Sequence, residues 1–95
     1  MTDQTNGLPV PAQITDDPRA IEMLRVWAAG GQQVVSLNPN LWDDPAHWGI
    51  MLVDLAKHIA SAYAQSGRYD STSALDRLKQ GFDVEWTSPT DASPN

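Results

Sequence analysis

The chain has 95 residues, a formal net charge of -6 and no cysteine. This length accommodates one small domain, and the lack of cysteine excludes disulfides as a source of stability. The negative charge argues against nucleic acid and against an anionic membrane surface as partners, because both would repel the protein. No apolar run approaches the ~20 residues of a transmembrane helix, and no secretion signal is recognisable at the N-terminus. We therefore expect a cytoplasmic protein.

Both ends of the chain are polar. Residues 1–16 are rich in Thr, Gln, Asp and Pro, and residues 88–95 contain two prolines and little that is apolar. Such segments bury too little apolar surface to offset the ~1–2 kcal/mol per residue that ordering a backbone costs. We expect residues 1–16 and 88–95 to be disordered and residues 17–87 to fold as a single α+β domain.

Residues 15–40, TDDPRAIEMLRVWAAGGQQVVSLNPN, allow two interpretations. In one, Pro18 takes the first helical position and Gly30 ends a helix. In the other, the glycine pair is the turn of a β-hairpin between two short apolar segments. The second segment contains the β-branched Val34 and Val35, and a strand there needs a neighbour because a lone strand is unstable. This favours the hairpin.

A long amphipathic helix is predicted over residues 45–66. Pro45 follows two aspartates that can cap the helix, and Gly67 is suited to end it. Apolar residues recur three and four positions apart and so share one helix face: Trp48, Leu52, Leu55, Ile59 and Ala62.

A second helix is predicted to begin at a cap, Asp70 or Ser71, and to end before Pro89. Its apolar stripe consists of Leu75, Leu78, Phe82 and Trp86. Because Trp48 and Trp86 lie on the two stripes, we expect both in the core. Gly81 costs ~1 kcal/mol relative to Ala inside a helix, which indicates a close neighbour or a bend there.

The predicted element order is therefore strand, strand, helix, helix (ββαα). A two-stranded sheet with two helices on one face leaves its other face and both edges open. Two such hairpins related by a two-fold axis would form a four-stranded sheet and bury that surface. We expect a homodimer, with Arg25, Trp27 and Trp42 as candidate contact residues.

One face of the first helix carries candidate ligands. His47, Asp54 and His58 are spaced by seven and four residues, which places them on one side of a helix. They could bind a metal or a small ligand, with Asp54 orienting His58 as a general base. The simpler interpretation is a solvated i,i+4 pair, and zinc normally needs three or four close ligands. We favour that interpretation, with no metal and no cofactor.

The chain lacks the motifs of common reactions. It has no G-x-S-x-G nucleophile elbow, no glycine-rich phosphate loop and no Asp-x-Asp-x-Asp-Gly calcium loop. Four tryptophans in so short a chain provide large apolar surfaces instead. We expect a small non-enzymatic protein that acts through protein–protein contacts. The alternative is an enzyme or ligand binder that uses Asp54 and His58 at a dimer cleft.

The stretch LRVWAAGGQQVVSLNPNLWDDPAHWGIMLVDLAKHIASAYA, with the later GFDVEWTSPTD, resembles a known family. It is a family of small uncharacterised proteins, a domain of unknown function, found mainly in alphaproteobacteria. The most specific residues are Arg25-Val26-Trp27, the glycine pair, Trp48-Gly49 with Asp54 and His58, and the closing Glu85 to Thr90. The resemblance implies the hairpin and a bacterial cytoplasmic setting, and it implies no activity or cofactor.

Overall fold

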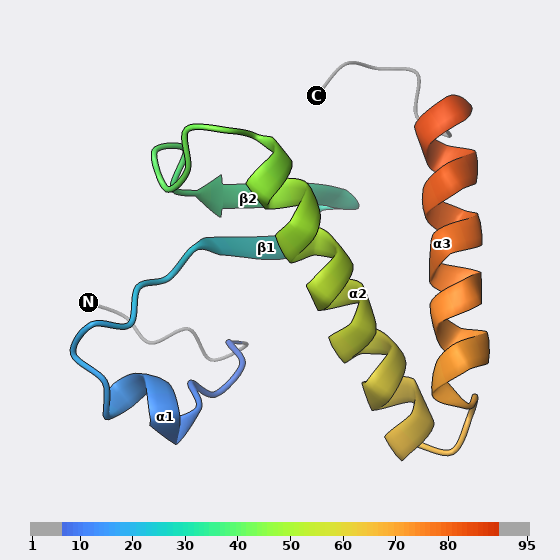
Figure 1. Ribbon diagram of the computed structural model, residues 1–95, viewed down its shortest axis with the longest axis horizontal. Helices are drawn as coiled ribbons and strands as arrows, with labels where there is room; N and C mark the ends of the chain where they lie inside the picture. The colour runs from blue at the N-terminus through green and yellow to red at the C-terminus, as the bar shows by residue number, and fades with distance from the viewer. Residues whose placement is uncertain (1–6, 90–95) are drawn as a thin grey trace. The chain divides into compact units, whose positions relative to one another are not determined.

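The computed structural model describes residues 7–89, and its contacts divide the chain into two compact units, Met1–Leu41 and Trp42–Asn95. The element order is α1 (Ala12–Thr15), β1 (Leu24–Ala29), β2 (Gln32–Leu37), α2 (Ala46–Gln65) and α3 (Ser71–Thr87) (Figure 1). A hairpin followed by two packed helices confirms the predicted α+β, ββαα arrangement. The single domain over residues 17–87 stays a prediction.

The hairpin turns at its glycine pair. Gly30 and Gly31 have φ angles of 60° and 77°, the left-handed region that a two-residue type I′ turn requires at both central positions. The antiparallel register runs from Ala29 opposite Gln32 to Leu24 opposite Leu37. The helical interpretation of this segment is therefore wrong, because the glycine pair reverses the chain instead of ending a helix.

A short helix, α1, lies inside the segment for which the composition predicted disorder. The backbone N–H of Ile14 donates to the Pro11 carbonyl at 2.9 Å, and the Thr15 hydroxyl donates to the Ala12 carbonyl. Local hydrogen bonds thus form one helical turn without any buried side chain. Residues 1–6 of that segment, and 90–95 of the predicted tail, lie outside the described residues.

Helix α2 begins and ends close to the predicted positions. The Asp44 carboxylate accepts the backbone N–H of Ala46 at 2.9 Å, so an aspartate satisfies a free donor of the first turn as expected. At the other end, Gly67 has a φ of 79°, which suits the residue that follows a helix C-cap.

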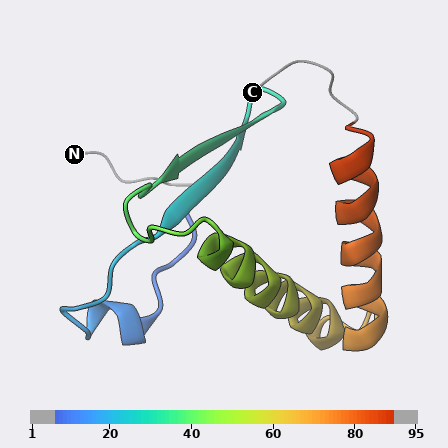
Figure 2. The same cartoon turned by 45° about the horizontal axis from the view of Figure 1, so that its top comes forward.

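Helices α2 and α3 lie closest near their connecting loop and diverge toward their far ends, as two views show (Figures 1 and 2). Among the described residues, only Ala60 and Ala74 are buried, with 2% and 4% of their surfaces exposed. Small side chains thus fill the part of the helix pair where α2 and α3 lie closest, near the loop. The predicted stripe is displaced from this part, because Ala62 is exposed.

The aromatic end of α3 also differs from the prediction. Trp86 is 76% exposed instead of lying in the core, because α3 has moved away from α2 at that level. A Cβ added at Gly81 would meet nothing within 4 Å. A side chain at position 81 would therefore lie in open space, and the close neighbour that the sequence allowed is not found among residues 7–89.

Candidate functional site

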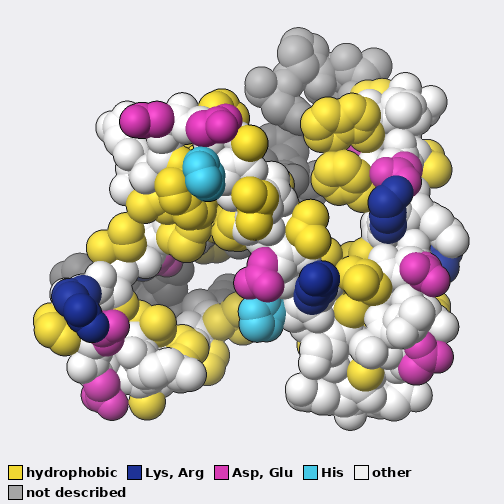
Figure 3. All heavy atoms as spheres, viewed as in Figure 1, with side chains coloured by type: hydrophobic (Ala, Val, Ile, Leu, Met, Phe, Trp, Pro, Cys, Tyr) yellow, Lys and Arg dark blue, Asp and Glu magenta, His cyan; other side chains and the backbone are white. Residues whose placement is uncertain are grey.

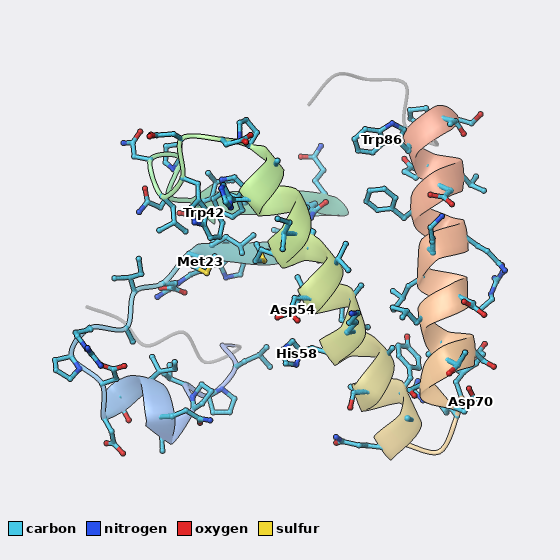
Figure 4. All side chains as sticks on the ribbon, viewed as in Figure 1. Met23, Trp42, Asp54, His58, Asp70 and Trp86 are labelled. Carbon is cyan, nitrogen blue, oxygen red and sulfur yellow. The ribbon has the colours of Figure 1, made fainter. Side chains whose placement is uncertain are left out.

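Asp54 and His58 form an exposed pair on α2. His58 Nε2 lies 3.7 Å from an oxygen of Asp54, and the two side chains are 77% and 74% exposed. Both project from the side of α2 that faces away from α3 (Figure 4). The predicted i,i+4 geometry is present, but solvent surrounds both groups, so the pair has the features of an ordinary surface interaction.

His47 shares the helix side of this pair but not its position along the axis. At ~1.5 Å per residue, His47 lies ~10 Å from Asp54 along the helix, too far for one ion with ligand distances of ~2 Å. The His47 ring instead stacks on Trp42, with centroids 5.9 Å apart. Within residues 7–89, no group of three His, Asp or Glu side chains could hold a metal ion.

Trp42 belongs to an aromatic cluster at the start of α2. Its ring meets Trp48 edge-to-face at 5.2 Å and stacks on His47. Such pairs contribute ~0.5–1.5 kcal/mol beyond the area that they bury. The cluster therefore fixes the entry into α2, and Trp42 already has partners within its own unit.

Arg25 and Trp27, the other candidate contact residues, lie on one face of β1. Trp27 is half-buried and stands opposite Val34 in the hairpin register. The Arg25 guanidinium donates to the Glu22 carboxylate, and this hydrogen bond lowers the pKa of Glu22 and raises that of Arg25. The role of these residues in a dimer contact stays a prediction.

An aromatic group that the sequence did not reveal surrounds the loop between α2 and α3. Tyr63 and Tyr69 meet edge-to-face at 5.9 Å, and the Arg68 guanidinium lies 4.5 Å above the Tyr63 ring. An open depression here is lined by Tyr63, Tyr69, Ala74, Arg77 and Leu78. The ring and cation contacts hold the helix–loop–helix connection together.

A second unpredicted feature is an exposed apolar surface at the far end of α3. Phe82 and Trp86, one helical turn apart, stack with centroids 5.4 Å apart and are 54% and 76% exposed. Hydrophobic side chains gather on this part of α3 in Figure 3, and Trp86 points toward the space between the diverging helices in Figure 4. We call Phe82 and Trp86 the aromatic stack.

On α2, Ile50 and Val53 are also exposed. At ~100° per residue they fall within about 80° of Ala60, on the side of α2 that turns toward α3. The diverging ends of the helices therefore present apolar side chains from both elements. The sequence contained the apolar spacing but not the divergence that leaves these side chains in solvent.

A model of the DUF5076 family, a domain of unknown function, matches residues 7–90. The chain belongs to the DUF5076 family. This confirms the predicted membership of a family without an assigned activity.

The DUF5076 chain is also similar to a protein of known structure from the photosynthetic bacterium Rhodopseudomonas palustrus CGA009, described as a "putative pyruvate dehydrogenase". The two are 33% identical, with a TM-score of 0.71 over 100% of this chain and 96% of the other. No curated protein matches this DUF5076 chain. Within residues 7–89, no helix is both long enough and apolar enough to span a bilayer.

Proposed function

We propose that this DUF5076 protein is a small non-enzymatic protein of the bacterial cytoplasm that acts through protein–protein contacts. The observation that carries the proposal is the aromatic stack. Exposed Phe82 and Trp86 present a large rigid apolar area at low entropic cost, and Trp is among the residues most enriched at binding hot spots.

The surroundings of the aromatic stack support the same proposal. The exposed fractions of Ile50 and Val53 on α2 are 67% and 58%. Exposed apolar side chains thus come from α2 as well as from α3, and exposed apolar surface of this kind often marks an interaction site. A partner helix or loop that covered these side chains would gain ~25 cal/mol of binding free energy for each Å² of apolar surface removed from water.

We further propose that the protein forms a homodimer through its hairpin. A two-stranded sheet is marginally stable by itself, and pairing with a second hairpin supplies the missing strands. The candidate contact residues Arg25, Trp27 and Trp42 belong to this proposal. Trp42 is the weakest of them, because its ring already contacts His47 and Trp48.

A second candidate function is small-ligand or metal binding at Asp54 and His58. The observation that favours it is the 3.7 Å approach of the imidazole to the carboxylate.

A pyruvate dehydrogenase activity, which the description of the similar Rhodopseudomonas protein names, is tested directly by following pyruvate consumption with the purified chain. We expect none above the buffer control.

The contact proposal is tested with a photo-crosslinking amino acid at Trp86 in the native host. Val84 provides a matched control, since it is also apolar and exposed but lies on nearly the opposite side of α3. We expect a discrete covalent adduct from position 86 and none from position 84. The adduct's second protein is then purified, and Trp86→Ser should weaken its binding at least tenfold. Equal adducts from both positions, or unchanged binding, would contradict the proposal.

A further inference from the structure

The outer edge of β2 lacks the features that usually protect an edge strand. Proteins usually shield an edge strand with a charged side chain or a proline within it. The strand Gln32–Leu37, QQVVSL, contains neither, and all six of its residues are exposed. By contrast, β1 carries Arg25, paired with Glu22. Each copy has a net charge of -6, so two copies repel each other. An uncharged edge is therefore a favourable place for two copies to meet.

The hairpin register fixes which backbone groups face outward from β2. In a two-residue hairpin the residues beside the turn, Ala29 and Gln32, are a hydrogen-bonded pair, and hydrogen-bonded and non-hydrogen-bonded pairs alternate from there. The backbone N–H of Asn38 donates to the Met23 carbonyl at 3.1 Å, as this alternation requires. The N–H and C=O groups at positions 33, 35 and 37 therefore point away from β1.

We infer that a second copy of this chain pairs with β2 in antiparallel fashion, with the two-fold axis at Val35. In this register Val35 stands opposite Val35 of the second copy, and Gln33 stands opposite Leu37. All the outward-facing backbone groups at positions 33, 35 and 37 then find partners, whereas an axis moved by one residue leaves some unpaired. The resulting strand order is β1-β2-β2-β1.

The side chains support the same pairing. Val35 and Leu37 share one face with Val26 of β1, and all three are about half exposed. The two-fold axis places both copies of these residues side by side, which extends the apolar face across the seam.

This inference rests on the proposed homodimer and adds which strands meet and in which register. Single introduced cysteines test the dimer and this pairing together. The chain has no cysteine, which makes any introduced thiol unique. In the inferred register the two Val35 Cα atoms are ~5.5 Å apart, within the range of a disulfide. Val35→Cys should form a covalent dimer under mild oxidation that dithiothreitol reverses. Val26→Cys, its cross-strand neighbour on the other edge, should stay a thiol.

Sedimentation of the unmodified chain separates the two ways in which the proposals can fail. A monomer at micromolar concentration defeats the homodimer. Suppose instead that the chain is a dimer. Cross-linking at Val26→Cys, at neither position, or equally at both positions would then retain the homodimer but overturn the inferred β2–β2 pairing. As a second test, Val35→Pro should abolish the dimer, because it removes a backbone N–H that bonds to the second copy in the inferred pairing. Val26→Pro should leave the dimer intact, because the N–H that it removes lies on the opposite edge of the hairpin. Neither variant removes a hydrogen bond between β1 and β2, since both N–H groups point away from the other strand.

Discussion

The Asp70 carboxylate accepts the backbone N–H of Ser73 at 2.8 Å and the hydroxyl of the same residue at 3.1 Å. These hydrogen bonds, the backbone one foremost, hold the pKa of Asp70 below its ordinary value of 3.8. The ionised carboxylate therefore caps α3 at neutral pH, and Asp70 is one of the two caps, Asp70 or Ser71, that the sequence allowed.

The cap makes α3 sensitive to acid. Because folding lowers the pKa of Asp70, its stabilising contribution is complete above the unfolded value and is lost as the pH falls through the folded value. Asp70→Asn keeps a capping oxygen without a charge. We expect the melting temperature of the wild type to fall more than that of Asp70→Asn between about pH 6 and about pH 2.5. Equal losses in thermal scans by circular dichroism would show that other carboxylates dominate.

Enlarging the alanine at the helix contact should destabilise the α2–α3 pair. Ala60 is 2% exposed, so the extra methyl groups of Ala60→Leu have no free space and force the helices apart. We expect a loss of ~1–3 kcal/mol in the free energy of unfolding by urea titration. The matched control is Ala62→Leu, on the exposed side of the same helix, which should change it by less than ~0.5 kcal/mol.

The hairpin turn should tolerate asparagine and reject a β-branched residue. Nothing lies within 4 Å of a Cβ at Gly30, so the cost of a substitution there comes from its φ of 60° and not from a clash. Gly30→Val should lose ~1–2 kcal/mol of hairpin stability, whereas Gly30→Asn creates the Asn-Gly pair that type I′ turns prefer. Amide exchange of β1 and β2 measures the difference, and equal protection in both variants would contradict a strained turn.

Two glycines in the helical unit should respond to alanine in opposite directions. Gly81 lies inside α3 with open space around it, so Gly81→Ala should raise the free energy of unfolding by ~0.5–1 kcal/mol. Gly67 has a φ of 79° after α2, and Gly67→Ala should lower it. If Gly81→Ala is destabilising instead, a partner must approach α3 at this point.

Removing the Asp54–His58 pair should leave the fold nearly unchanged. Both side chains are mostly exposed, and such a pair contributes no more than ~0.5 kcal/mol. We expect Asp54→Ala with His58→Ala to keep the melting temperature and to match the wild type in calorimetric titration with Zn²⁺. If the wild type binds the ion and the double variant does not, the ligand-binding candidate replaces the simpler interpretation.

Local chemistry made much of the fold predictable. The glycine pair at 30–31, Asp70 and Gly67 each act through their own backbone and its nearest neighbours, so the sequence located the hairpin turn and the helix ends. The burial of Ala60 and the exposure of Trp86 depend instead on the angle between two helices. No spacing within one helix encodes that angle, and the apolar stripe alone placed Trp86 in the core.

The candidate site shows the same division. The spacing of Asp54 and His58 placed them together on one side of α2, as the structure confirms. It could not tell whether another element would cover that side. The hydrophobic spacing of Phe82 and Trp86 likewise gave their common face, but only the divergence of α2 and α3 shows that this face is open.

The use of alanine where α2 and α3 lie closest has a mechanical consequence. A buried methyl group contributes only ~0.8 kcal/mol, because it buries little area. The buried Ala60 and Ala74 therefore offer little resistance to a change in the angle between α2 and α3. The ring contact between Tyr63 and Tyr69 holds the loop end of the pair, whereas the far ends of α2 and α3 diverge (Figure 2). We therefore expect the angle between α2 and α3 to change more readily than it would in a helix pair held by large buried side chains.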